Sequence, residues 1–255
     1  MTFDLSPWTF FLVFGRTSAL IAFFPMFAEA QVPRAIRVST ILWISLAILP
    51  VLPPSTWQPA TLPDLAIAVG MEAMLGALFA LTARLIFSGV MLGAQWIDAE
   101  IGFQVVQQIN PLSGTPNSPV GILLLITTSL MFWAFGYFED MLLFWARIFH
   151  ILPPPIVAFS PAVGETLVTL SSQIFFRALE ILTPILVVMF LVTLAIGLMA
   201  RAVQGVNIFV ESYNIKLIIG MVTLVATAPI LLALLHKHLE MIPESWMAIL
   251  RALKT

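Results

Sequence analysis

Residues 102–119 read GFQVVQQINPLSGTPNSP and interrupt a chain that is otherwise strongly apolar. The stretch combines glutamines, an Asn-Pro step and a run of Gly, Ser and Pro, which are residues that break regular helices. At membrane depth, backbone that is neither helix nor closed sheet occurs only where it is buried in protein or lines a water-filled cavity. The stretch therefore indicates a conduit or a gate more than a reaction centre.

The composition of the whole chain indicates an all-α integral membrane protein. Of its 255 residues, 60% are hydrophobic and 9% are charged, and the mean hydropathy is +1.05. A helix needs about 20 apolar residues to cross a bilayer, and residues 120–138, 181–200 and 217–235 are uncharged runs near that length. Residues 7–28, 38–52 and 65–92 are also apolar but have isolated charges in or beside them. We expect about six hydrophobic helical segments.

Clusters of proline predict the connections between these segments, because proline removes a donor and clashes with the preceding turn. We expect one membrane-embedded domain over residues 1–255, with N-terminal hairpins at 1–92, an amphipathic segment and plug-like loop at 93–119, and C-terminal hairpins at 120–255. Basic residues occur both in the first loop and near the C-terminus, which six full crossings cannot place on one side. Either one segment does not cross, or assembly with partners overrides the charge rule, and both favour hairpins within a complex.

The sequence gives little support to an enzyme. Without cysteine there is no thiolate site, and His236 and His238 are two positions apart and do not share a helix face. The carboxylates Asp98 and Glu100 have the same unfavourable spacing for acid/base catalysis. We therefore expect no catalytic residue, metal or cofactor. The formal charge of -2 is spread over isolated residues, so we expect no nucleic-acid partner.

Charged residues inside apolar segments are the next candidates, since they are costly in lipid and normally face a bundle interior, a partner or water. They are Arg16, Glu72, Arg84, Arg177, Glu180, Glu211 and Lys216. Arg177 and Glu180 lie three positions apart on one helix face and are expected to pair with each other. For Glu72, Glu211 and Lys216, structural or inter-subunit pairing is favoured over ion conduction.

Two interpretations of residues 102–117 remain open. The simpler one is a surface loop between helices. The other is a plug that obstructs a pore, with an apolar face, amides presented to water and a Pro/Gly tail that lets the element move. The candidate plug residues are Gly102, Phe103, Val105, Val106, Gln107, Ile109, Asn110, Pro111, Ser113 and Gly114.

Several short motifs, taken in order, resemble the FliR/SctT family of export-gate proteins of flagella and type III injectisomes. The opening, with Arg16, Pro25, VPR at 32–34 and Pro50, is similar to the family pattern R…P…SVP[KR]…P. GF at 102–103 and NPLSG at 110–114 are similar to GFS…DPxSG, and FHILP at 149–153 to FHxLP. GLMAR at 197–201 and NIFV at 207–210, followed by Lys216, are similar to GLLxR…NxFVxxxPLK. Asn in place of Asp at position 110, and Asp98 and Glu100 in place of Gly and Gln, indicate a divergent branch.

The resemblance implies a non-enzymatic structural and gating subunit of a protein-export channel in the bacterial inner membrane, with a flagellar system favoured over an injectisome. It implies kinked helical hairpins, one copy per assembly with FliP-like and FliQ-like subunits, and contact with an FlhB-like switch protein and membrane lipid. In this family the loop matching residues 102–117 helps to keep the channel shut until unfolded substrates pass. The alternative from another class is a stand-alone secondary transporter or ion channel that uses Glu72, Glu211 and Lys216.

Overall fold

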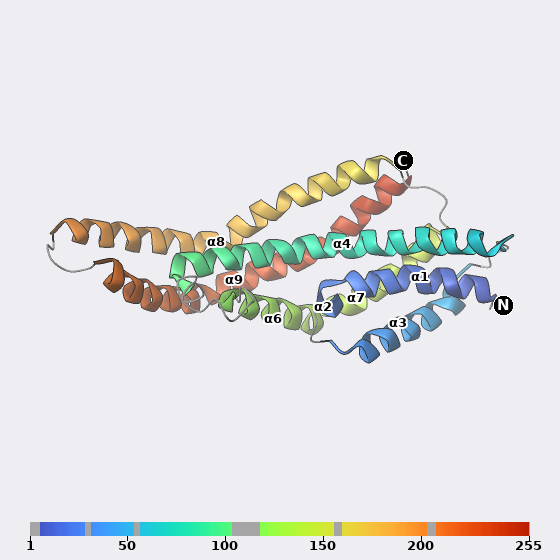
Figure 1. Ribbon diagram of the computed structural model, residues 1–255, viewed down its shortest axis with the longest axis horizontal. Coiled ribbons are helices and arrows are strands. Elements are labelled where there is room, and N and C mark those ends of the chain that lie inside the picture. Colours follow the sequence, from blue (N-terminus) through green and yellow to red (C-terminus); the bar gives the residue numbers. More distant parts are fainter. Residues whose placement is uncertain are drawn as a thin grey trace. The chain divides into compact units, whose positions relative to one another are not determined.

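A computed structural model of the protein describes residues 6–28, 32–53, 57–103, 118–155, 160–202 and 208–254 (Figure 1). Within these ranges the chain is helical and has no strand, which confirms the predicted all-α class. The elements are α1 (Pro7–Phe23), α2 (Pro25–Ala28), α3 (Arg34–Ile48), η1 (Leu49–Val51), α4 (Leu62–Ile101), α6 (Pro119–Ala134), α7 (Tyr137–Ile151), α8 (Ala162–Ala202) and α9 (Ile208–Lys254).

Among the described residues, four helices are long and apolar enough to cross a membrane: Arg34–Val51, Leu62–Ile101, Ala162–Arg201 and Ser212–Lys254. The pair α6 and α7, bent by 66°, would form a fifth span. The predicted segments correspond to α1, α3, α4, α6, α8 and α9, but α1 has only 17 residues. Six is therefore approximate as a number of membrane crossings, although the apolar segments themselves lie where the sequence placed them.

Three helices are much longer than a bilayer requires. The helices α4, α8 and α9 have 40, 41 and 47 residues. At a rise of about 1.5 Å per residue, their contour lengths are about 60 to 70 Å, whereas the hydrocarbon core of a bilayer is about 30 Å thick. Roughly half of each helix must therefore find surroundings other than one layer of lipid tails.

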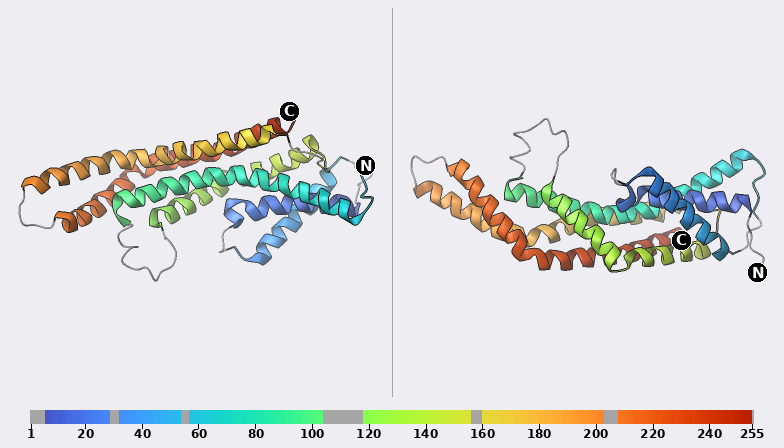
Figure 2. Two further views of the ribbon diagram at one scale, coloured as in Figure 1. Left: turned by 45° about the horizontal axis from the view of Figure 1, so that its top comes forward. Right: turned by 90° about the horizontal axis from the view of Figure 1, so that it is seen from below.

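The chain divides into two compact units. Unit 1 contains Met1–Leu85, Phe132–Ser171 and Met241–Thr255, and unit 2 contains Ile86–Met131 and Ser172–Glu240. In unit 1, α1 contacts α3. In unit 2, the segments of α8 and α9 run side by side (Figure 2).

The core of unit 1 is built around buried aromatic rings. Phe79 packs edge-on against Trp145 and Trp246, with ring centroids 5.7 and 5.5 Å away. Both indole N–H groups find acceptors, since Trp145 donates to the Thr17 hydroxyl at 3.3 Å and Trp246 to the Phe79 carbonyl at 3.0 Å. A buried tryptophan normally has such a partner, so these bonds fix the rings of α7 and α9 against α1 and α4.

Close helix contacts in both units depend on glycine. A Cβ added to Gly76 on α4 would lie 2.0 Å from the carbonyl oxygen of Arg16, so α1 and α4 touch there through their backbones. In unit 2, a Cβ on Gly93 would lie 2.8 Å from the carbonyl oxygen of Ala178 on α8. Small residues commonly permit such approach between helices in membranes. The apolar core of unit 2 then forms from α4, α6, α8 and α9 around Ile97, Ile181 and Leu224.

Candidate functional site

Two of the charged residues singled out in the sequence meet in the interior of unit 1. Arg16 on α1 donates from Nε to Oε2 of Glu72 on α4 at 2.5 Å, and both side chains are fully buried. Nη1 of Arg16 also donates to the Leu152 carbonyl at 2.9 Å, and the guanidinium lies 4.4 Å from the centroid of the Phe149 ring. The pair is therefore surrounded by its own chain and stabilised by contacts on several sides, as a buried ion pair requires.

A second polar site is formed by residues that precede and follow residues 104–117 in the sequence. Asp98, near the end of α4, is buried, and its carboxylate accepts hydrogen bonds from the Ser118 hydroxyl and from the Val120 N–H, the latter at 3.2 Å. The Gly121 N–H donates in turn to Ser118 Oγ at 2.9 Å. These bonds satisfy amides at the start of α6, where unpaired N–H groups and the helix dipole favour an anion. We call Asp98 and Ser118 the α4–α6 anchor.

In the sequence, Asp98 stands out only as half of an unfavourable catalytic pair and as a departure from the family pattern, so its anchoring role was not predicted. A usable signal was present, because Ser118-Pro119 is a typical capping residue followed by proline at the first helical position. The sequence could not show that Asp98 is the hydrogen-bond partner of Ser118, since the two residues are 20 positions apart.

Only the first two candidate plug residues fall within the described residues. Gly102 ends α4 with a φ of 103°, and its N–H donates to the Asp98 carbonyl at 3.0 Å. A Cβ there would lie 3.2 Å from the Tyr213 ring, so both conformation and space require glycine. Phe103 packs against the apolar core of unit 2. Outside the described residues lie Val105, Val106, Gln107, Ile109, Asn110, Pro111, Ser113 and Gly114.

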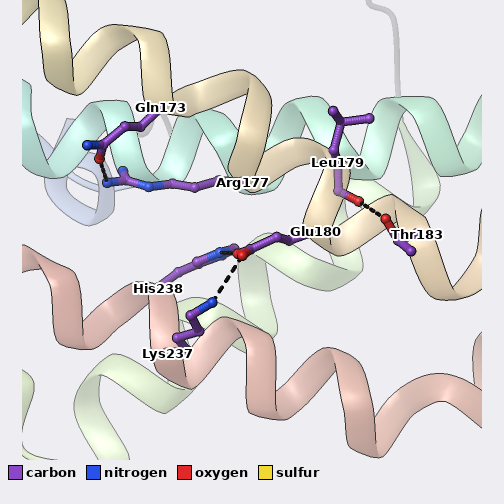
Figure 3. Close-up of polar contacts among 7 residues, drawn as sticks. All are labelled: Gln173, Arg177, Leu179, Glu180, Thr183, Lys237 and His238. Atoms are coloured by element: carbon purple, nitrogen blue, oxygen red, sulfur yellow. Dashed lines mark hydrogen bonds and ion pairs between the residues drawn. The ribbon is translucent and has the colours of Figure 1, made fainter.

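Figure 3 shows a polar cluster between α8 and α9 in unit 2. Glu180 accepts from Lys237 Nζ at 3.0 Å with one carboxylate oxygen, and its other oxygen lies 2.9 Å from His238 Nε2. Arg177 donates to the Gln173 side chain at 2.8 Å. Arg177 and Glu180, predicted to pair, attract each other electrostatically, but their close contacts are to Gln173 of α8 and to Lys237 and His238 of α9, respectively. Spacing along one helix could not show that a neighbouring helix offers Glu180 closer partners.

Of the three remaining charged candidates, the structure describes the side chains of Arg84 and Lys216. Arg84 is exposed on α4 at an open cavity of about 390 Å³ that is otherwise lined by apolar side chains. Within the described residues, neither Arg84 nor the half-buried Lys216 on α9 has a hydrogen-bond or ion-pair partner. Glu211 lies in α9, but its side chain is outside the description. In the same ranges, no three His, Asp or Glu residues could hold a metal ion.

Comparisons with known proteins identify the family. Residues 8–242 match the model of "Bacterial export proteins, family 1". The chain is 24% identical to the flagellar biosynthetic protein FliR of Bacillus subtilis over 95% of this chain and 94% of that protein. It is 24% identical to FliR of Pectobacterium carotovorum over 90% of this chain and 88% of that protein. It is also 30% identical to the Yop proteins translocation protein T of Yersinia pestis over 63% of this chain and 62% of that protein.

The family match begins in α1 and ends in α9, so it includes the Arg16–Glu72 pair, the α4–α6 anchor and the Glu180 cluster. The chain therefore belongs to the bacterial export proteins of family 1.

Proposed function

We propose that this protein is a membrane subunit of the type III protein-export apparatus, in a flagellar system of the bacterial inner membrane. The observation that carries the proposal is the family match over residues 8–242, together with relatives named as flagellar biosynthetic and Yop translocation proteins. The apolar helices support a location in the membrane. The protein is a component of the conduit, and its substrates are the polypeptides that pass.

Partner subunits resembling FliP and FliQ, and a switch protein resembling FlhB, complete the proposed assembly. Support comes from the surface of α8, which exposes many large apolar side chains, among them Val187, Phe190, Leu191 and Leu198. It also comes from the contour lengths of α4, α8 and α9, which are about twice the thickness of a bilayer core. Lipid covers part of this apolar surface, and neighbouring subunits cover the remainder.

Within that assembly, the segment at residues 102–117 acts as a steric plug, and other components supply the energy that displaces it. Its polar composition supports this role. The α4–α6 anchor supports it as well, because Asp98 joins the residue before α6 to the last turns of α4. A segment that is displaced as a plug requires fixed attachment points at both of its ends.

The alternative function, a stand-alone ion channel, would use Glu72, Glu211 and Lys216, and the structure gives no support to the first of them. Glu72 is enclosed with Arg16, so an ion path through Glu72 finds no support in the geometry. The membership in an export family favours the first function.

The subunit proposal is tested by extracting the tagged protein from its native membranes in mild detergent and measuring the mass of the intact complex by native mass spectrometry. We expect a single copy in a hetero-oligomer with two other small hydrophobic proteins. A monomer or a homo-oligomer that persists under the mildest extraction would overturn the proposal.

The plug is tested separately by deleting residues 113–117, which spares the anchoring Ser118. We expect a larger ion leak across membranes that contain the assembled complex. A matched control replaces the same residues by an equally long Gly/Ser sequence, which keeps the obstruction but changes its side chains. Unchanged conductance in an assembled deletion variant would contradict the plug.

A further inference from the structure

Between residues 67 and 84, in unit 1, the exposed residues of α4 form a single line. Between residues 67 and 84, the exposed positions are 67, 70, 74, 81 and 84, and the half-buried position 77 continues the line. Every other side chain of α4 in this range is buried or half-buried. We call the line the α4 seam; it consists of Ile67, Gly70, Met74, Ala77, Leu81 and Arg84.

The spacing of the seam alternates between three and four residues. A repeat of about 3.5 residues keeps one edge of a helix against a second helix that winds around it, as in a left-handed coiled coil. The exposed face of any helix repeats every three or four residues, so the period permits a helix as the neighbour, and the choice of neighbour rests on the side chains.

Large and small side chains alternate along the seam, with Ile67, Met74 and Leu81 separated by Gly70 and Ala77. A Cβ added to Gly70 would meet no atom within 4 Å, whereas one on Gly76 would strike the Arg16 carbonyl oxygen. Packing within this chain thus explains Gly76 but does not explain Gly70. Small residues at such positions let the backbone of a second helix approach, and the large ones fill the gaps between its side chains.

The seam ends in a charge with no counter-ion in the described residues. The cavity of about 390 Å³ beside the seam is lined by Phe23, Met74, Ala77, Leu78, Leu81 and Arg84. Arg84 is the one charged residue in that lining, and within the described ranges its guanidinium has no partner. A cation in apolar surroundings is costly unless an anion or a polar group meets it. An occupant of the seam that carries an anion would therefore compensate the charge of Arg84.

We propose that the α4 seam is the docking site for an apolar helix of another subunit of the export apparatus, and that an Asp or Glu of that helix pairs with Arg84. This proposal rests on the proposed function. The alternation of large and small residues and the open space at Gly70 favour a helix over a lipid chain, and the unpaired guanidinium fixes the register of that helix along the seam.

The test compares assembly of variants by native mass spectrometry of the complex purified from its native membranes. Gly70→Leu fills the seam and Arg84→Glu reverses its charge, so each should lower the yield of the complex by more than about tenfold. Gly164→Leu is the matched control, because Gly164 also has nothing within 4 Å of an added Cβ but lies on α8 outside the seam. Arg84→Lys keeps the charge and should retain assembly.

A photo-crosslinking residue at Met74 identifies the neighbour in the otherwise unchanged complex, so it decides the question even where Gly70→Leu or Arg84→Glu fails to fold. We expect a crosslink to a helix of another subunit that contains an acidic residue. A crosslink to phospholipid alone, or full assembly of both seam variants, would overturn the docking site. If the wild-type protein is a hetero-oligomer and the variants assemble equally well, only the proposed docking site is contradicted. If the wild-type protein has no partner subunits, both the docking site and the proposed function are contradicted.

Discussion

The two charged clusters, Arg16 with Glu72 in unit 1 and Glu180 with Lys237 and His238 in unit 2, differ in their exposure. In unit 1, Arg16 and Glu72 are fully buried together, with a carbonyl and an aromatic ring as further contacts of the arginine. In unit 2, Glu180 and Lys237 remain 42% and 57% exposed, and the neighbouring His238 and Arg177 are buried. The first pair is part of a core, and the second cluster lies at an edge that another molecule can reach.

The difference predicts unequal consequences of substitution. Removing one partner of a buried ion pair leaves a charge without compensation and costs about 3 to 5 kcal/mol. A solvent-exposed pair contributes about 0 to 1 kcal/mol. The Arg16–Glu72 pair should therefore be intolerant of single changes, whereas loss of the Glu180–Lys237 pair should have little effect on the stability of unit 2.

The largest effect is expected from Glu72→Leu, which leaves Arg16 buried without its carboxylate. We expect a loss of about 3 to 5 kcal/mol in the free energy of unfolding, measured by denaturant titration of the protein in detergent. The double variant Arg16→Leu/Glu72→Leu should recover much of that loss, since both charges are then absent. A single variant as stable as the wild type would show that the enclosure of the pair is unimportant for unit 1.

Gly76→Ala is expected to come next, because its Cβ would overlap the Arg16 carbonyl oxygen at 2.0 Å. Overpacking of this kind costs about 1 to 3 kcal/mol. The change also displaces the helix that carries Arg16, so it tests the same region by a different route. Gly70→Ala on the same helix is the control and should be neutral or slightly stabilising, since its Cβ meets nothing within 4 Å. Equal melting temperatures of the two variants would contradict the close contact of α1 and α4.

Asp98→Ala tests the α4–α6 anchor, which is a buried polar contact within unit 2. It removes the acceptor for Ser118 and for the Val120 N–H, and loss of a helix cap costs about 0.5 to 2 kcal/mol. Amide hydrogen exchange should increase in the first turn of α6 and stay unchanged in α1. Asp98→Asn keeps one acceptor oxygen and should lie between the wild type and the alanine variant. Unchanged exchange at Val120 and Gly121 would rule out the anchor.

The smallest effect is expected from Lys237→Ala, because the pair with Glu180 is largely open to its surroundings. The loss in unfolding free energy should be below about 1 kcal/mol. Glu180→Ala should cost more, because it also leaves the buried His238 without its contact at 2.9 Å. If Lys237→Ala proved as damaging as Glu72→Leu, the contrast between the buried and the exposed pair would not hold.

The sequence predicted the class of the fold because composition and apolar segment length are local properties. It also identified Arg16 and Glu72 as buried-charge candidates, since charges inside apolar runs are conspicuous. It could not pair them, because they are 56 residues apart and meet only when α1 packs on α4. For Arg177 and Glu180, the local spacing predicted a direct pair, whereas the close partners of Glu180 are Lys237 and His238 of α9.

One signal for helix packing was present in the sequence and was not used. Gly89 and Gly93 form a GxxxG pattern on α4, and both face α8 at short distance in unit 2. The α4 seam, in contrast, could not have been found from the sequence, because the choice of exposed face depends on which sides α1 and the other helices cover. The plug residues beyond Phe103 stay a prediction.

The contour lengths of α4, α8 and α9 have a consequence for the order of events in the cell. A newly inserted single chain has more apolar helix than one bilayer can surround, so part of that surface meets water or a quality-control protease until other subunits arrive. We therefore expect the free subunit to be short-lived, and its steady-state amount to follow the supply of its partners more than its own rate of synthesis. The lengths of these helices therefore require that the partner subunits be synthesised at the same time as this protein.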